Sequence, residues 1–346
     1  MTFPLPPLLR VLLGAGLGCL VAAAAQAECL RPLLHRNQIP PSAIFLELQP
    51  ESACSLAFGT WTLTTSVQHS NTAIISFQHI TDPDPKMVLD HERQERTARL
   101  SLGGPWDTQW SLTARHIEDS TGHWDGFMRE FHHRLELPYS SRKVLTDYDY
   151  LYLLCNPDCR SYMTPNNALW VRDPESGWGD TILSFKQEIW RPEETLAVGW
   201  RVDLKVPNEK DRPTLGSGKP DHGFGGMVEG GIGATIGWLW NIGLVFPQET
   251  EHTVFDQESV LLNTSGTVHW RFAEQWTAGV QGLTSSPRYR ISGNPVKGLT
   301  DWQVLTALEL RWRHPAHELR FALTEDLIYN NSEDFSLIAQ WEWEFL

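Results

Sequence analysis

The sequence predicts an all-β protein, a transmembrane antiparallel up-and-down β-barrel of about twelve strands, or fourteen, with one short amphipathic helix in a long loop. Two observations carry this prediction, aromatic composition and a period-two residue pattern. The 346 residues include 16 Trp and 14 Phe, although only 41% are hydrophobic and 20% are charged. Aromatic residues without long apolar runs are typical of barrels with aromatic girdles. The formal net charge of −14 argues against nucleic-acid binding through phosphates.

The N-terminus indicates export. Arg10 supplies a positive charge, an apolar run follows at 11–25, and Ala25-Gln26-Ala27 has the small-residue pattern of a cleavage site. We therefore expect a signal peptide over residues 1–27. The apolar run is too short to span a membrane as a helix.

Four cysteines remain after residue 27, an even number that favours disulfides in an oxidising compartment. Three pairings are possible. We favour Cys29–Cys54 and Cys155–Cys159, because each closes a local segment and 155–159 has turn residues at its centre. A zinc site is the alternative, but the spacing lacks a second ligand pair, and we predict no metal and no cofactor.

Strands are indicated by apolar residues that alternate with polar ones. Over 335–345 one face carries Phe335, Trp341, Trp343 and Phe345, while the other is mostly polar. The same alternation recurs at 60–67, 109–115, 196–206 and 306–313. The polar faces carry charges of both signs, as in a barrel lumen, while lipid contacts the apolar faces.

The connections are of two kinds. Short turns are expected at 103–105, 191–194 and 314–317, and long polar loops at 119–147, 208–221 and 286–299. Short turns at one rim and long loops at the other are the outer-membrane arrangement. We divide the chain into the signal (1–27), an N-terminal periplasmic or plug-like segment (28–54) and the barrel (55–346). The glycine-rich stretch 223–237 is interpreted as relief of crowding in a curved strand.

One segment, 124–137, has a helical period. Phe127, Phe131 and Leu135 form an apolar stripe, and Pro138 ends the helix. We predict that this helix packs in the barrel mouth and pairs its charges with lumen residues such as Arg115 and Asp203. The ligand or gating candidates are therefore Asp125, Phe127, Phe131, His132, Arg115 and Asp203. The alternative places the helix flat on the membrane, anchored by Trp124.

No catalytic residues are predicted. His69 and Ser70 are the nearest match to a barrel lipase, but adjacent residues on a strand point to opposite faces. His132 and His133 diverge by about 100° on a helix and cannot bind one ion together.

Several motifs carry a resemblance: 35–40, 122–127 (GHWDGF), 177–180 (GWGD), 204–208 (LKVPN) and 215–218 (LGSG) with Asp221. On these the mature chain resembles an uncharacterised family of proteobacterial outer-membrane β-barrels. The last motifs are also similar to the wider superfamily of hydrophobic-compound and fatty-acid outer-membrane channels, where the Lys205 motif reads K-x-P-T-G. The resemblance implies fold and location in the cell outer membrane, and no activity.

The expected function is a narrow or gated channel or transporter for a small solute, and not an enzyme. The alternatives are an outer-membrane enzyme acting on lipid or lipopolysaccharide, and a structural or surface-interaction barrel with a filled lumen. The expected partners are outer-membrane lipid, lipopolysaccharide and the outer-membrane assembly machinery, with no nucleic acid. The sequence does not predict the oligomeric state.

Overall fold

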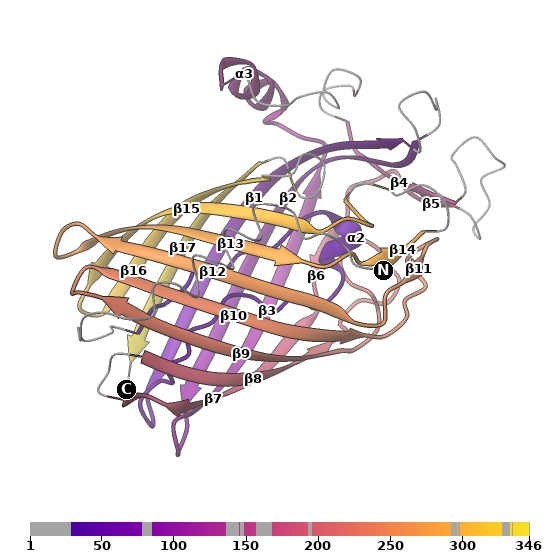
Figure 1. Ribbon diagram of the computed structural model, residues 1–346. Coiled ribbons are helices and arrows are strands. Elements are labelled where there is room, and N and C mark those ends of the chain that lie inside the picture. The colour runs from indigo at the N-terminus through magenta and orange to yellow at the C-terminus, as the bar shows by residue number, and fades with distance from the viewer. Residues whose placement is uncertain are drawn as a thin grey trace, which may run out of the picture.

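The computed structural model describes residues 29–77, 85–135, 145, 149–156, 168–192, 196–291, 296, 298–326, 333 and 335–345. Its main element is an antiparallel barrel (Figure 1). The barrel strands are β1 (Trp61–Phe77), β2 (Pro85–Gly103), β3 (Thr108–Ser120), β7 (Thr181–Trp190), β8 (Leu196–Val206), β9 (Asp221–Ile232), β10 (Ile236–Pro247), β12 (Leu261–Arg271), β13 (Trp276–Ser285), β15 (Gln303–His314), β16 (His317–Asp326) and β17 (Phe335–Phe345).

Each barrel strand pairs with its neighbour in sequence, and β1 closes the barrel against β17 with Trp61 opposite Phe345. The prediction of about twelve strands is therefore confirmed for the described residues. Fourteen is wrong, because β4 (Leu151–Cys155) and β5 (Ala168–Val171) extend from the end of β2 without entering the barrel. Small additions are β6 (Ser176–Trp178), β11 (Asp256–Gln257) and β14 (Tyr289–Arg290), with helices α2 (Pro40–Ala43) and α3 (Asp125–Leu135).

The two rims differ as predicted. At the short-turn rim, two residues separate β15 from β16, and three separate β9 from β10. Both Trp61 and Phe345 lie at this rim. The opposite, long-loop rim carries the connections from β3 to β7, β8 to β9 and β13 to β15. In outer-membrane barrels the short turns face the periplasm and the long loops face outward.

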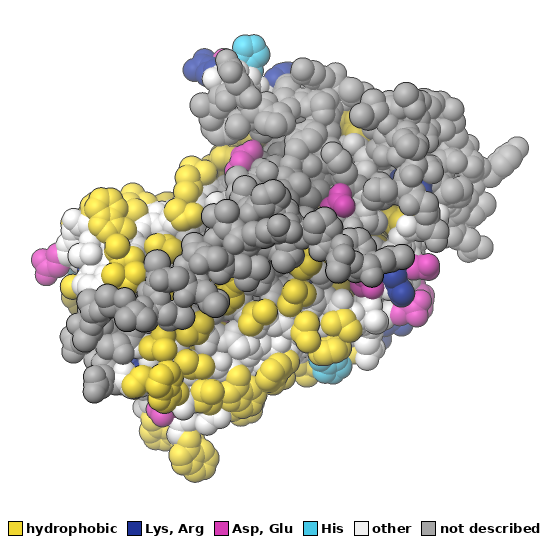
Figure 2. Space-filling model, in the orientation of Figure 1, with side chains coloured by type: hydrophobic (Ala, Val, Ile, Leu, Met, Phe, Trp, Pro, Cys, Tyr) yellow, Lys and Arg dark blue, Asp and Glu magenta, His cyan; other side chains and the backbone are white. Residues whose placement is uncertain are grey.

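Side chains alternate between the two faces of the barrel wall. Outward positions are apolar and exposed, as at Phe224, Val280, Leu308 and Phe321. Figure 2 shows such side chains spread over the barrel surface on the visible face. This is the surface that lipid covers in a membrane barrel. Among the described residues, no helix is long and apolar enough to cross a membrane.

Candidate functional site in the barrel lumen

Residues 30–54 form one segment that lies inside the barrel, and we call it the luminal segment. All but two of its residues are buried, although the segment has no strand. Its hydrogen-bond partners lie on opposite walls: Gln281 on β13, Gln340 on β17, Asn241 on β10 and Lys186 on β7. Only a segment in the lumen can reach all of these strands.

The luminal segment has two arms. The first arm (residues 30–39) runs from the short-turn rim toward the long-loop rim, and the second arm (residues 44–54) returns. Between them α2 reverses the chain, with Pro40 and Pro41 in the first helical positions, where a missing N–H costs nothing.

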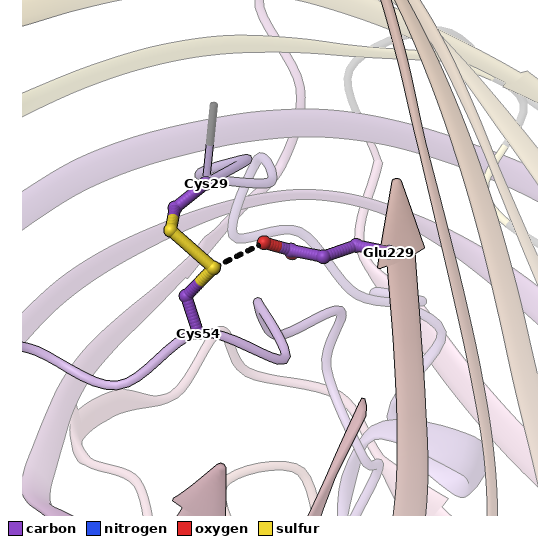
Figure 3. Close-up of side chains that lie close together, drawn as sticks. All are labelled: Cys29, Cys54 and Glu229. Atoms are coloured by element: carbon purple, nitrogen blue, oxygen red, sulfur yellow. Dashed lines mark hydrogen bonds between the residues drawn. A yellow bond between two sulfur atoms is a disulfide. The ribbon is translucent and has the colours of Figure 1, made fainter. Parts of the chain in front are cut away.

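A disulfide joins the arms at the short-turn rim. Cys29 and Cys54 are bonded with their Cα atoms 5.8 Å apart, which confirms this predicted pair (Figure 3). Cys159 lies outside the described residues, so its pairing with Cys155 stays a prediction. Close by, the Glu229 carboxylate accepts the backbone N–H of Leu30 at 3.3 Å and of Ala53 at 3.1 Å. One carboxylate on β9 therefore holds both arms.

Glycines on the wall make room for the luminal segment. A Cβ at Gly237 would lie 2.6 Å from Leu30 Cδ2, and a Cβ at Gly223 would lie 2.6 Å from Leu48 Cδ2. The glycine-rich stretch 223–237 therefore accommodates side chains of the two arms. Curvature of the strand, which the sequence analysis invoked, is not the main reason for these glycines.

Motif residues meet around the start of the second arm. Lys205 Nζ lies 3.2 Å from Asp180 Oδ2 and 2.7 Å from Asp221 Oδ2, and all three side chains are fully buried. Lys205 Nζ also donates to the Ser217 hydroxyl and to the carbonyl of Ile44, each at 2.6 Å. Asp221 in turn accepts the N–H of Leu46 at 2.8 Å. The GWGD, LKVPN and LGSG motifs thus build one anchor for the second arm.

Ionic contacts continue along the second arm. Glu51 lies 2.7 Å from Arg99 Nη1 and 2.9 Å from Lys186 Nζ, and Arg201 donates to the Gln49 carbonyl at 2.5 Å. Burial alone would raise the pKa of Glu51, but Lys186, Arg99 and Arg201 outweigh burial and lower the pKa to about 2. Glu51 is therefore a carboxylate at physiological pH.

The first arm is held mainly by carboxamides of the wall. Gln281 accepts the N–H of Leu33 at 3.2 Å and donates to its carbonyl at 2.9 Å. Gln340 accepts the N–H of Leu34 at 2.9 Å, and Gln68 donates to the Arg36 carbonyl at 3.1 Å. Ionic contact with the wall is concentrated at the lower end, where Arg31 donates to Glu342 and Glu344.

Apolar packing is also unequal. Ile44, Phe45, Leu46 and Leu48 of the second arm belong to a large cluster with wall and loop residues such as Val245. The first arm contributes Ile39, near the tip, to that cluster, and lower down Leu33 packs with Ala307, Ala322 and Ile338. The second arm therefore buries more apolar side chains than the lower first arm.

A cavity of about 230 Å³ lies beside the first arm at the short-turn rim. Its lining includes Arg31 and Leu34 of the first arm, hydroxyl residues of β1 such as Thr62, and Glu342 of β17. Pro50, Glu51 and Ser52 of the second arm line it as well, so the lumen keeps open space between the two arms at this rim.

The predicted site residues are placed apart from each other. Asp125 accepts a hydrogen bond from Asn71 at 2.8 Å, and the Trp124 ring lies 5.1 Å from that of His69, on the outward face of β1. Phe127 is 55% exposed. The prediction that this helix lies in the lumen is wrong for these residues, and Figure 1 shows α3 outside the barrel beyond β1 and β2. The side chains of Phe131 and His132 lie outside the described part.

Arg115 and Asp203 do face the lumen, but their partners are wall groups. Arg115 donates to the Asp180 carbonyl at 3.3 Å, and Asp203 pairs with Arg201 at 2.6 Å. The expected pairing of these two residues with the helix is therefore wrong. Sequence reasoning missed Glu229, Lys186 and Glu51, since a lumen-facing charge gives no sign of which segment it binds.

The nearest match to a lipase site does not assemble. His69 faces outward beside Glu92, with Nε2 3.4 Å from Oε2, whereas Ser70 is buried and its Oγ lies 3.3 Å from the Arg93 carbonyl. Among the described residues, one group of three metal-ligand side chains lies close together: Cys29, Cys54 and Glu229. Two of these are already joined by the disulfide.

Solved structures similar to this chain are outer-membrane barrels. The COG4313 outer membrane channel from Pseudomonas putida F1 is 12% identical, with a TM-score of 0.55 over 86% of this chain and 100% of that chain. The Ralstonia pickettii toluene transporter TbuX is 6% identical, with a TM-score of 0.39 over 84% and 90%. At such identity the first likeness shows the fold alone, and the second is too distant to add to it. The chain thus has the outer-membrane β-barrel fold.

The sequence comparison agrees. Residues 9–150 match the model of a family described as "Protein of unknown function (DUF3187)". No curated protein matches the chain. The match, which covers less than half of the chain, and the barrel fold shared with the COG4313 channel confirm the predicted resemblance to an uncharacterised family and to outer-membrane barrels. They assign no activity.

Proposed function

We propose that this protein is a gated channel for small solutes in the outer membrane, with the luminal segment as its gate. The observation that carries the proposal is the occupant of the lumen: a separate N-terminal segment fills it, held by hydrogen bonds and ion pairs. Such a segment can leave without any strand of the wall breaking.

The proposal includes export and orientation. Cleavage after Ala27 would start the mature chain just before Cys29, whose disulfide lies at the short-turn rim. Insertion by the assembly machinery would place that rim in the periplasm and the long loops toward lipopolysaccharide. The gate would then open toward the periplasm, where its disulfide can form.

Planar-bilayer conductance of a variant that lacks residues 30–54 tests the proposal. We expect a steady conductance that the full-length protein lacks, because polar wall groups then face a water-filled lumen. Removal of residues 124–135, which include the outward helix α3, is the matched control and should leave conductance unchanged. Heat-modifiable gel mobility verifies that each barrel is folded.

A structural barrel with a filled lumen is the second candidate, and the large apolar cluster of the second arm favours it. In that case a folded barrel without residues 30–54 would conduct, but the full-length protein would never open under any voltage or solute. Brief openings of the full-length protein in the bilayer would therefore support the gated channel and contradict the structural barrel.

A further inference from the structure

We propose that Glu342 and Glu344 form a binding site for small organic cations with a guanidinium or primary ammonium group, which Arg31 occupies in the closed channel. The role in transport rests on the proposed function, whereas the binding site does not. The guanidinium of Arg31 donates to a carboxylate oxygen of each glutamate, one from Nη1 and one from Nη2. The first arm thus places its own cation in the site.

Neighbouring groups shape the site. Glu342 is largely buried, with its side chain 11% exposed, and it also accepts the Thr64 hydroxyl at 3.4 Å. Arg320 Nη2 lies 3.9 Å from Glu342 Oε2 and gives one further cationic neighbour. Glu344 is 44% exposed at the rim, so a solute can reach the pair from the short-turn side.

The cavity beside the first arm provides the space. It is bordered by Arg31, Glu342 and Glu344, and on the opposite side by Glu51 with its partners Arg99 and Lys186. If Arg31 leaves with the first arm, the charged groups lining the cavity include one more carboxylate than cations. A cationic solute then restores the balance, whereas an anion meets a surplus of negative charge.

The cavity also has unmet hydrogen-bonding capacity. Gln340 is 3% exposed and lines the cavity, and its Nε2 has no hydrogen-bond partner among the described residues. Its Oε1 accepts the N–H of Leu34. A buried amide donor without a partner is costly, and a cationic solute that also carries an oxygen acceptor would satisfy it once the first arm has moved. This second observation is independent of the two glutamates.

Chemical rescue of Arg31→Ala tests the site. Ethylguanidine is the probe, and its binding to the purified variant is measured by isothermal titration calorimetry, without any reference to conduction. We expect binding to Arg31→Ala to be at least about tenfold tighter than to the unchanged protein, which corresponds to about 1.4 kcal/mol. In bilayers we expect Arg31→Ala to conduct more than the unchanged protein, because the first arm has lost its ion pairs with Glu342 and Glu344. Ethylguanidine bound at the two glutamates should reduce that conductance.

Three controls make the result specific. Arg31→Ala combined with Glu342→Gln and Glu344→Gln should lose the binding. Arg96→Ala removes an exposed arginine that pairs with Glu118 on the outer face, and it should gain no binding. Tetramethylammonium has the same charge but no N–H donors, and it should bind weakly, since guanidinium recognition by carboxylates depends on paired hydrogen bonds.

Equal binding of ethylguanidine to Arg31→Ala and to the triple variant would overturn the cation site. So would equal binding of tetramethylammonium. If ethylguanidine binds as expected but a folded barrel lacking residues 30–54 does not conduct, the site stands and the proposed channel function fails. If that barrel conducts and ethylguanidine does not bind, only the cation site fails.

Discussion

The two arms of the luminal segment lie in the same barrel but are held by different chemistry. Lys205, Arg201, Arg99 and Lys186 bind backbone carbonyls or the Glu51 carboxylate of the second arm. Carboxamides hold the middle of the first arm. Hydrogen bonds to charged groups contribute about twice as much as neutral ones. At its ends the first arm also has charged contacts, because Arg31 pairs with Glu342 and Glu344 and the N–H of Gln38 donates to Glu333. Between these ends the first arm has the weaker contacts with the wall and is the part that can be released at lower cost.

The largest effect is expected at the anchor of the second arm. Lys205→Met leaves Asp180 and Asp221 buried without their shared cation, and loss of one partner of a buried ion pair costs about 3–5 kcal/mol. We expect a lower unfolding temperature in heat-modifiable gel mobility. Gln340→Leu, the matched change at the first arm, removes one neutral hydrogen bond, from the N–H of Leu34, and should cost about 1–3 kcal/mol. Equal losses in the two variants would contradict the difference between the arms.

This contrast bears on what the sequence could predict. Barrel class, the rims and Cys29–Cys54 follow from local patterns, namely alternation, turn residues and cysteine spacing. The sequence leaves residues 28–54 as a periplasmic or plug-like segment. It does not predict which wall groups hold residues 30–54, because these residues have no period that marks a partner. The placement of Phe127 in the barrel mouth was wrong for a similar reason. An apolar stripe predicts that one face of a helix is buried, but it does not predict which surface covers that face. Lys205 stood in a motif, but only the fold brings Asp180 and Asp221 to it.

The second prediction removes the disulfide that joins the arms. Cys29→Ser with Cys54→Ser opens a loop with a sequence separation of 25, and a loop of that size is stabilised by about 3 kcal/mol in the chain-entropy account. The first arm then keeps its hydrogen bonds to the wall but is no longer joined covalently to the second arm at the short-turn rim. Hydrogen exchange should rise more over residues 30–39 than over 44–54. Cys155→Ser with Cys159→Ser is the control and should leave exchange in both arms unchanged.

The third prediction is that the two arms lose stability in different ranges of acid pH. Burial lowers the pKa of His35 in the first arm to about 4, from a model-peptide value of about 6.5. The folded state thus favours neutral His35, and stability is lost as pH falls from about 6.5 toward 4. Glu51 in the second arm has a lowered pKa of about 2, so its contribution is lost only below about 4.5.

Limited proteolysis across this pH range measures the order of release. We expect cleavage in the first arm to begin at higher pH than cleavage in the second. His35→Gln should remove the earlier loss and leave the later one. Cleavage of both arms at one pH in the unchanged protein would contradict the two windows.

The smallest effect concerns the tip, where the arms meet the long-loop rim. Glu333 accepts the N–H of Gln38 at 3.0 Å and a hydrogen bond from Gln68 at 3.2 Å. Burial raises the pKa of Glu333 to about 7, so the folded state favours its protonated form. The sign is opposite to that of Glu51: the contribution of Glu333 to stability is fully present below about pH 4.5 and is lost as pH rises through 7.

Glu333→Gln keeps an oxygen acceptor for Gln38 and removes the charge. We expect hydrogen exchange over residues 38–43 to rise between pH 6 and 8 in the unchanged protein and to lose that pH dependence in Glu333→Gln, after correction for the intrinsic exchange rate. Residues 49–54 of the second arm serve as the internal control, since this stretch leaves out Glu47, whose charge acts on Glu333. A pH dependence that persists in Glu333→Gln would assign the effect to another group. An equal change in both stretches would mean that the luminal segment moves as one body, and the two arms would then not be separate in function.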